Sequence, residues 1–397
     1  MMEKSARIAI AKQIMELIDN DTPFFGAESW EADIGRFIDK DRFELEKRKL
    51  FLERPQLIAL SGDLPNPGDY FATDIAGKPI LIVRNKDGKA QAFLNACRHR
   101  GVKLAEEGCG HGKGFVCPYH GWTFNNDGEL ISVPSRSAFD VAQLANRDLI
   151  ALPTAEDIGV IVVHPQPEGH LDLDAFLGDM KALLEDLDIG SWEQIAHYRA
   201  PARINWKHAV DGGMEAYHTP FLHPTTFVTD GGGFLPVMEM GDHHALITSG
   251  PQIKALEAIP EADWPHDCGF GSVNAIFPNT VIGGGPLQPV LFFQRTEPMT
   301  EPGECHYNFR LYGPKNGTPE QKEAARKAVD LFMKVSLEED LPAQTSCQLM
   351  MEAGAVPSVL FGKRESSLTG MHKNYDAAIG HDVEAALRSN SAAMGVR

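Results

Sequence analysis

Cysteine and histidine gather in one short stretch, residues 97–122, which reads CRHRGVKLAEEGCGHGKGFVCPYHGW. They form three pairs, in which one or two residues separate the cysteine from the histidine: Cys97/His99, Cys109/His111 and Cys117/His120. Thiolates and imidazoles are common metal ligands, and clustered cysteines in a reducing compartment bind metal more often than they form disulfides. The stretch therefore predicts a metal centre.

Loop length favours the two outer pairs as ligands. Only five residues separate the middle pair from the last, whereas seventeen separate the first pair from the last. A glycine follows each outer pair (Gly101 and Gly121), and glycine permits the tight backbone of a metal-binding loop. We therefore predict four ligands: Cys97, His99, Cys117 and His120. Cys109 and His111 then belong to the connection between the two loops.

Two thiolates and two imidazoles suit two kinds of centre. Tetrahedral zinc accepts the same donors. A [2Fe–2S] cluster with two cysteines on one iron and two histidines on the other also fits, because each predicted loop supplies one donor of each kind. Many zinc fingers instead keep a cysteine pair apart from a histidine pair, so the mixed pairs favour the cluster and leave zinc as the alternative.

A second group of candidate ligands lies in DGGMEAYHTPFLH, residues 211–223. His218 and His223 are five residues apart, which on a helix separates them by about 140°. Pro220 disfavours helical geometry at Thr219, so we expect the helix to end there, with His218 in its last turn and His223 beyond it. A single histidine is more often a structural residue, but two that bracket a helix end beside a carboxylate favour a metal.

The carboxylate that completes this site has two nearby candidates. Asp211 and Glu215 are expected on the same helical face as His218. Asp211 lies about 10 Å along the helix axis from His218, too far to share a metal if the helix is regular.

A more distant candidate lies in the acidic triplet at 338–340. The preceding helix carries an apolar stripe that includes Val329, and Asp340 continues it at about 20° from Val329. By the same count Glu338 points away and Glu339 lies at the edge of the stripe. An acid on the buried face needs a partner, and Pro342 is expected to break the helix just after it.

The elements that position these groups indicate an α+β protein. Residues 1–50 have amphipathic helical spacing, and short strands follow from about residue 57 to 165, with turns expected at Asp87-Gly88 and Asp127-Gly128. Helical stretches and three β-like runs come next: 272–284, 289–298 and 304–313. The last run alternates apolar and polar residues, as in a half-buried antiparallel strand. A long helix is expected from Thr318-Pro319.

Bulk composition excludes some functions. The chain has 397 residues and a formal net charge of −18, which disfavours non-specific binding to nucleic acid. No run of about 18 apolar residues predicts a membrane span. Lys12 and Glu16 interrupt any apolar core of a signal peptide, so we expect a cytoplasmic protein.

Two motifs resemble a known family. C-x-H-x(17)-C-x-x-H, with the flanks CRHRG and CPYHGW, resembles the Rieske [2Fe–2S] motif. NWK-x(7)-E-x-Y-H-x(4)-H, followed by E-D-x-P-x(5)-Q, resembles the catalytic domain of Rieske non-heme iron oxygenases, in their large α subunit. The resemblance implies a small all-β Rieske domain over 57–165. It also implies a helix-grip catalytic domain over 166–397, with an antiparallel sheet and covering helices, to which 1–56 contributes an N-terminal helical part.

The resemblance also assigns roles to the residues of the second site. It implies that His218, His223 and Asp340 hold a mononuclear Fe(II), and that Glu215 bridges the two metal centres by reaching His120 of a neighbouring subunit in a homotrimer. Gln348 matches a glutamine that follows the ligand aspartate in the family. Two positions depart from the pattern, because the bridging acid is more often Asp and the acid at 211 is usually followed by Asn rather than by Gly212-Gly213.

The implied activity is that of a terminal oxygenase. Such a protein takes electrons from NAD(P)H through a reductase or ferredoxin and uses O2 to hydroxylate or demethylate a small organic substrate, here expected to be aromatic. A quaternary-amine monooxygenase of the carnitine type is the alternative, because the rarer glutamate at 215 also resembles those enzymes. A third possibility is a Rieske electron carrier whose second site is vestigial or filled by zinc.

Two sets of residues have both a functional and an ordinary interpretation. Four basic residues of the cysteine-rich stretch could form a docking patch for an acidic electron donor or make salt bridges to Glu106 and Glu107: Arg98, Arg100, Lys103 and Lys113. Five aromatic residues of the β-like runs could line a substrate pocket, although core packing is expected for most: Phe277, Phe292, Phe293, Tyr307 and Phe309.

Overall fold

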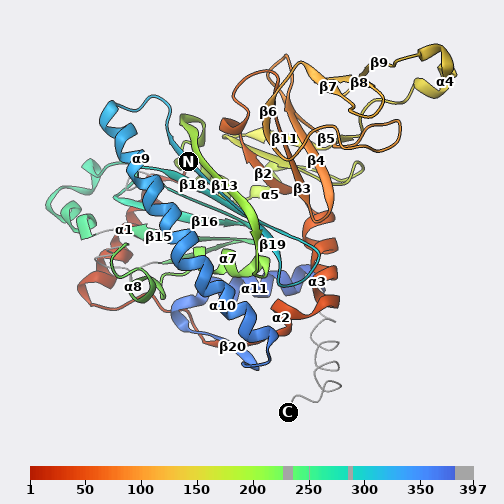
Figure 1. The fold of residues 1–397 in the computed structure, drawn as a ribbon. Coiled ribbons are helices and arrows are strands. Elements are labelled where there is room, and N and C mark those ends of the chain that lie inside the picture. The colour runs from red at the N-terminus through yellow and green to blue at the C-terminus, as the bar shows by residue number, and fades with distance from the viewer. Residues whose placement is uncertain (227–235, 250, 285–288, 381–397) are drawn as a thin grey trace. The chain divides into compact units, whose positions relative to one another are not determined.

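The structure is a computed structural model that describes residues 1–226, 236–249, 251–284 and 289–380 (Figure 1). The chain forms two compact units. One consists of Met1–Leu50 and Leu177–Arg397, and the other consists of Phe51–Phe176. The second unit is thus inserted into the sequence of the first. The domain limits predicted after residues 56 and 165 stay predictions.

A seven-stranded antiparallel sheet organises the first unit. Its order is β13-β19-β18-β17-β16-β15-β14. The strands are β13 Trp192–Ala202, β14 Val237–Met240, β15 His243–Ser249, β16 Phe270–Ile276, β17 Thr280–Gly284, β18 Leu291–Pro298 and β19 Cys305–Pro314. The three predicted β-like runs all lie in this sheet, and the first of them folds as the β16–β17 hairpin. The expected antiparallel sheet is therefore confirmed.

Strand β19 is buried on both faces, so the prediction of a half-buried strand is wrong. On its polar face Asn308 is 0% exposed and Arg310 is 1% exposed. Hydrogen bonds compensate part of this burial, because Asn308 Oδ1 accepts from His197 Nε2 at 3.1 Å and from Arg310 Nε at 3.3 Å. The alternation of polar and apolar residues therefore shows that the strand has two different faces. It does not show that the polar face is exposed to solvent.

Helices pack against this sheet, and α9 and α10 follow one another along it (Figure 1). Helix α7 contacts β17, β18 and β19, α9 contacts β19, and α11 contacts β14 and β15. The helices of this unit are α1 Lys4–Asp19, α2 Gly35–Ile38, α3 Lys40–Glu46, α6 Met180–Asp186, α7 Trp206–Gly213, α8 Thr219–Leu222, α9 Pro319–Lys334, α10 Leu341–Glu352 and α11 Ser366–Ile379. In the described part of the chain, no helix is long and apolar enough to cross a membrane.

Shorter elements complete the first unit. Two segments are π-helical, η1 Lys47–Leu52 and η7 Val335–Asp340, and η1 runs across the junction into the second unit. Single turns of 3₁₀-helix occur at η4 Ile189–Ser191, η6 Glu261–Asp263 and η8 Lys363–Glu365, with a longer one at η5 Pro251–Ala258. The N-terminal fifty residues, predicted as helical, also contain the strand β1 Trp30–Asp33, which pairs with β20 Ser358–Phe361. The first segment of the chain is thereby tied to one of its last.

The second unit is built from short antiparallel strands in three sheets. Their orders are β10-β5-β4-β3-β6, β11-β12-β2 and β7-β8-β9. The strands are β2 Gln56–Leu60, β3 Asp69–Ile75, β4 Lys78–Arg84, β5 Ala90–Leu94, β6 Gly108–His111, β7 Gly114–Val116, β8 Thr123–Asn125, β9 Leu130–Ser132, β10 Ala151–Leu152, β11 Thr154–Asp157 and β12 Val160–Val163. The short helices are η2 Ser61–Asp63, η3 Arg136–Ala138, α4 Val141–Leu144 and α5 Leu173–Leu177.

Both predicted turns of this unit are confirmed. Gly88 joins β4 to β5 and Gly128 joins β8 to β9, with φ of +78° and +82°. These angles are in the left-handed region that glycine adopts without steric cost. A buried apolar cluster joins these hairpins to the cysteine-bearing loops, since it contains Leu81, Phe124 and Cys117.

Candidate metal centres

The two outer cysteine loops have the same backbone hydrogen bonds. In each, the cysteine carbonyl accepts from the N–H of the glycine four residues later, at 2.9 Å from Gly101 and 3.0 Å from Gly121. In each, the cysteine N–H donates to the carbonyl five residues later, at 2.8 Å. Both glycines have positive φ, +82° and +69°, so a side chain there would strain the loop. Two matching loops thus present Cys97 and Cys117 in equivalent positions.

The four donors fall into a buried thiol pair and an outer imidazole pair. Cys97 and Cys117 are 3% and 2% exposed. Burial raises the pKa of the Cys97 thiol, and the neighbouring Cys117 raises it further. The rings of His99 and His120 lie 4.6 Å apart, and His120 is exposed.

This arrangement fits a cluster with two irons. Thiols on one side and imidazoles on the other match an iron–sulfur centre with one iron bound by cysteines and one by histidines. Nδ1 of His99 is buried and has no hydrogen-bond partner among the described residues. A buried ring nitrogen without a partner is costly unless it binds something, which agrees with a ligand role.

The middle pair lies elsewhere in the second unit. Cys109 and His111 are on β6, which pairs with β3, and Cys109 is exposed. Nδ1 of His111 lies 2.8 Å from Asp69 Oδ1. The structure therefore does not bring this pair into the group formed by the other four residues.

The first unit contains the second donor set. Single ligand atoms of His218, His223 and Asp340 lie within 4.8 Å of one another. Asp340 Oδ1 is 3.0 Å from Nε2 of His223 and 3.7 Å from Nε2 of His218. Two imidazoles and one carboxylate that converge in this way match the facial site typical of non-heme Fe(II), which leaves further coordination positions open.

The histidines reach this site by a different route from the one predicted. Helix α7 ends at Gly213 rather than at Thr219, and His218 is the N-terminal capping residue of the short helix α8. Pro220 stands in the first turn of α8, where its missing N–H costs nothing, so it starts a helix instead of ending one. His223 caps the other end of α8. One helical turn therefore separates the two imidazoles.

The paired glycines end α7 where it packs closely against its neighbours. A Cβ on Gly212 would lie 2.6 Å from Nε2 of Gln344, and one on Gly213 would lie 3.4 Å from Val281. Larger residues at 212 would displace the Gln344 side chain. The glycines therefore allow close packing at the end of the helix that precedes the histidines.

Asp340 is placed by a wide helical turn. Residues Val335–Asp340 are π-helical, and the N–H of Leu341 donates to the carbonyl of Ser336, five residues earlier. Such segments are frequent at functional sites. The predicted break at Pro342 is wrong, because this residue lies in the first turn of α10 and the helix continues to Glu352. The wide turn, rather than a helix end, makes room for the site.

A carboxylate contacts the second ring nitrogen of each histidine. Glu215 Oε1 is hydrogen-bonded to Nδ1 of His218, and its other oxygen accepts from the His218 N–H at 3.2 Å. Glu339 Oε2 lies 2.7 Å from Nδ1 of His223 and accepts from Oγ1 of Thr226 at 2.7 Å. Both imidazoles therefore direct Nε2 toward Asp340. Regular helical spacing puts Glu339 only at the edge of the helical face, so this contact was not predicted.

The electrostatics of the site favour a cation. Burial opposes a charge on His218, but its hydrogen bond to Glu215 and the nearby carboxylates raise the pKa of this histidine. Burial raises the pKa of Asp340, although both imidazoles act in the opposite direction. Burial also opposes ionisation of Glu339, yet hydrogen bonds from Thr226 and His223 lower its pKa. A divalent cation between the three ligands would balance this concentration of acids.

Two other residues highlighted by the sequence have structural contacts. Asp211 is paired with His372, whose Nε2 lies 3.1 Å from both carboxylate oxygens, so it does not join the three converging ligands. Gln348 is fully buried, and its Oε1 accepts from the Asn205 N–H at 3.0 Å. Since Asn205 caps the start of α7, Gln348 holds the helix that leads to the histidines.

Two of the four basic residues of the cysteine-rich stretch contact other residues of the second unit. Arg100 Nη1 donates to the Tyr119 hydroxyl at 3.1 Å and its guanidinium lies 5.2 Å from the tyrosine ring. Arg98 Nη2 reaches the Asn146 carbonyl at 3.4 Å. The docking role of this patch stays a prediction.

Most of the five aromatic residues considered for a substrate pocket are packed in the core. Phe293 and Phe309 are 0% and 2% exposed, and Phe292 contacts Phe332 of α9. Tyr307 is also buried, at 3% exposed, and burial followed by the nearby Asp340 charge raises its pKa. Its hydroxyl donates to Gln294 Oε1 at 2.9 Å.

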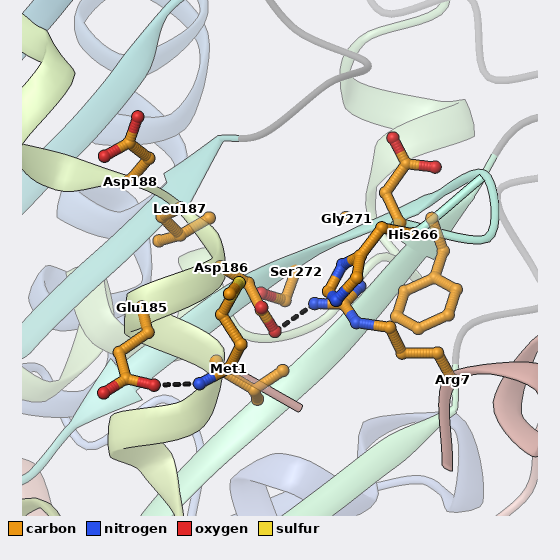
Figure 2. Close-up of a pocket in the computed structure, with 12 residues that line it drawn as sticks. Met1, Arg7, Glu185, Asp186, Leu187, Asp188, His266, Gly271 and Ser272 are labelled. Atoms are coloured by element: carbon orange, nitrogen blue, oxygen red, sulfur yellow. Dashed lines mark hydrogen bonds and ion pairs between the residues drawn. The ribbon is translucent and has the colours of Figure 1, made fainter. Parts of the chain in front are cut away.

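A cavity of about 650 Å³ lies in another part of the first unit (Figure 2). It is lined by α1, the end of α6 and the start of β16, and Arg7 points across it to an ion pair with Asp186. None of the predicted metal ligands is among its lining residues.

Comparison with known proteins agrees with both centres. Residues 54–151 match the Rieske [2Fe–2S] domain, and residues 189–381 match the ring-hydroxylating α-subunit catalytic domain. The chain belongs to the Rieske oxygenase α-subunit family. All eight predicted ligand and bridging positions fall within these two matched segments. The individual ligand roles remain our assignment.

Curated relatives of this Rieske subunit act on different substrates. The α subunit of benzene 1,2-dioxygenase from Pseudomonas putida is 32% identical over 41% of the chain and 36% of its own length. The α subunit of toluate 1,2-dioxygenase from the same species is 27% identical over 69% of this chain and 60% of its own length. The carnitine monooxygenase oxygenase subunit of Escherichia coli is 31% identical over 50% of this chain and 53% of its own length. The matched part thus spans between about a third and three fifths of these relatives.

Solved structures show the same fold. Naphthalene 1,2-dioxygenase from a Rhodococcus species, bound to indole, has a TM-score of 0.74 at 18% identity, covering 96% of this chain and 99% of that one. The quaternary ammonium monooxygenase CntA in complex with L-carnitine has a TM-score of 0.72 at 21% identity. The match covers 88% of this chain and 95% of that one. At these identities the likeness concerns the fold and leaves the substrate open.

Proposed function

We propose that this chain is the terminal oxygenase component of a Rieske-type electron-transfer system. In this proposal it uses O2 and electrons from NAD(P)H, delivered by a reductase or ferredoxin, to hydroxylate or demethylate an aromatic substrate. The observation that carries the proposal is that one chain holds both donor sets, the matching cysteine loops and the His218, His223 and Asp340 group. A cytoplasmic location, where NAD(P)H is available, is part of the proposal.

Each donor set has a defined task. Four residues would hold the [2Fe–2S] cluster: Cys97, His99, Cys117 and His120. His218, His223 and Asp340 would hold Fe(II). Bound there, the cluster supplies one-electron storage and the mononuclear iron supplies O2 activation. The chain buries the thiols, leaves His120 exposed toward partners, and holds the imidazoles of the iron site through their Nδ1 atoms.

The assembly in the proposal is a homotrimer. Glu215 is already hydrogen-bonded to His218, and the family resemblance assigns its further contact to His120 of a neighbouring subunit. A ring of identical subunits is a closed arrangement in which every chain both gives and receives this contact. Light scattering measures the assembly, and a fully active monomer would contradict the route between subunits.

A quaternary-amine substrate is the second candidate. The bridging position holds glutamate, and the carnitine monooxygenase oxygenase subunit of Escherichia coli is 31% identical over half of this chain. A quaternary ammonium group needs an aromatic cage or an acid close to the iron. Tyr307 is a buried aromatic residue near enough to Asp340 for that charge to raise its pKa.

Iron analysis and a product screen test the proposal together. The purified protein should contain about three irons and two acid-labile sulfides per chain, whereas an electron carrier with an unused second site would contain about two irons. Incubation with reductase, NADH and O2 over aromatic acids, aryl ethers and betaines should give a hydroxylated or demethylated product from one class. NADH oxidation without product from any class would contradict the proposal.

A further inference from the structure

We propose that Glu339 is a positioning residue that orients His223 for metal binding. The proposal rests on the mononuclear iron site proposed above and gives a role to Glu339, which the E-D-x-P motif contains but to which neither the motif nor the helical-face count assigned one. Glu339 immediately precedes Asp340, so one short segment supplies a metal ligand and the support of another ligand.

The hydrogen bond between Glu339 and His223 can run in only one direction. A carboxylate can only accept, so the Glu339 oxygen at 2.7 Å places the proton of the neutral His223 ring on Nδ1. The lone pair is then on Nε2, which faces Asp340 Oδ1 at 3.0 Å. Hydrogen bonds of this kind fix the tautomer and ring orientation of metal-binding histidines and raise their basicity.

Glu339 is itself held in place by a second hydrogen bond. Oγ1 of Thr226 donates to the same carboxylate oxygen at 2.7 Å, from the chain just beyond α8. The Glu339 side chain is 19% exposed and His223 is 3% exposed, so the contact is largely shielded from water. Lys334 lies 3.9 Å away but is half exposed, and such a pair contributes little. Thr226 therefore contributes more to orienting this carboxylate than Lys334 does.

The wide turn of η7 carries both Glu339 and Asp340. By regular helical spacing, Glu339 and Asp340 would point about 100° apart around the axis. In the π-helical segment Val335–Asp340 both carboxylates contact the same imidazole, one at each ring nitrogen. The local geometry thus serves both acids and not the ligand alone.

Affinity for the mononuclear metal tests this role without turnover. Fe(II) binding by the cluster-containing protein is measured anaerobically by competition with a chromophoric chelator, for wild type, Glu339→Ala, Glu339→Gln and Glu338→Ala. Glu338 is exposed and adjacent, which makes it a matched control. Loss of such a supporting group typically weakens metal affinity by about 10–100-fold, and we expect this for Glu339→Ala.

The conservative variant and a spectrum separate positioning from general stability. Glu339→Gln keeps an acceptor oxygen but loses the charge, so its affinity should lie between those of wild type and Glu339→Ala. With Co(II) in the site, the visible ligand-field bands should shift in Glu339→Ala and stay in place in Glu338→Ala. The cluster spectrum should be the same in all four proteins.

Distinct outcomes overturn the two proposals. If Asp340→Ala binds the metal as tightly as wild type, the site itself is wrong. If Asp340→Ala loses the metal but Glu339→Ala or Glu339→Gln binds it as tightly as Glu338→Ala, only the positioning role is wrong. Glu339→Gln alone decides the question if the alanine variant does not fold.

Discussion

His208 should make the folded protein lose stability in mild acid. It lies on α7, the helix that leads to the metal-ligand histidines, and is 8% exposed, with its ring stacked on Phe37 at 4.4 Å and 9°. Burial lowers its pKa to about 4, although the nearby Asp211 acts in the opposite direction. A histidine in an unfolded chain has a pKa near 6.5.

The sign and size of the effect follow from these two values. Because the folded-state pKa is lower, the unfolded chain takes up the proton first as pH falls. The contribution of His208 to stability is therefore complete above about pH 6.5 and is lost toward pH 4. At 1.36 kcal/mol per pKa unit, the loss between pH 7 and pH 5 is about 2 kcal/mol.

Urea unfolding of wild type and His208→Gln at pH 7 and pH 5 measures this loss. The decrease in the free energy of unfolding from pH 7 to pH 5 should be smaller in the variant by about 2 kcal/mol. His244, whose pKa burial also lowers to about 4, contributes equally in both proteins and cancels. His266→Gln, at an exposed position of the same unit, should behave as wild type. An equal decrease in wild type and His208→Gln would refute the reasoning.

Three further predictions concern the metal centres. Cys117→Ala should abolish the visible absorption of the cluster and Cys109→Ala should retain it, and the reverse result would show that the wrong pair was chosen. Asp340→Ala should remove the mononuclear iron and turnover while two irons and the sulfides remain, as iron and sulfide assays will report. Glu215→Gln should keep both centres but slow single-turnover electron transfer from cluster to iron severely, because the residue loses its charge and one acceptor oxygen. Transfer at the wild-type rate, with unchanged iron content, would exclude the bridging role.

The two groups of candidate donor residues could be singled out from the sequence because metal binding constrains their spacing. The seventeen residues between His99 and Cys117 leave room for two loops, and the glycine after each pair marks the left-handed position that closes the loop. The same holds for His218 and His223, since Pro220 signals an interruption between them. The family resemblance and the antiparallel sheet followed from these motifs and from strand patterning.

The local path of the chain was less predictable, because single residues have more than one structural use. Pro220 and Pro342 both start helices in the structure, whereas the sequence alone suggested that both end them. Gly213, where α7 ends early, lies close to Val281, which is distant in sequence. Tertiary contacts therefore decided between alternatives that local propensity left open.

Glu339 was missed because the helical count assumed a regular helix. A π-helical turn changes the direction of every side chain after it, and the sequence VSLEED gives no clear local signal of such a turn. The burial of Asn308 and Arg310 was missed for a related reason. Polar residues are usually exposed, and only their specific partners allow them to be buried.

The wide turn at Val335–Asp340 also sets a limit on how the length of this segment can vary. Phe332 of α9 and Met351 of α10 are both buried and are nineteen residues apart. In a regular helix this spacing would separate them by about 100°, whereas one residue absorbed by the wide turn leaves five whole turns and brings them into line. Deleting one residue between 335 and 340 would restore a regular helix with a spacing of eighteen residues between these two, so their buried sides would stay in line, whereas inserting one residue would rotate α10 by about 100°. Loss of one residue should therefore keep the alignment of α9 with α10 while removing the wide turn that carries Glu339 and Asp340.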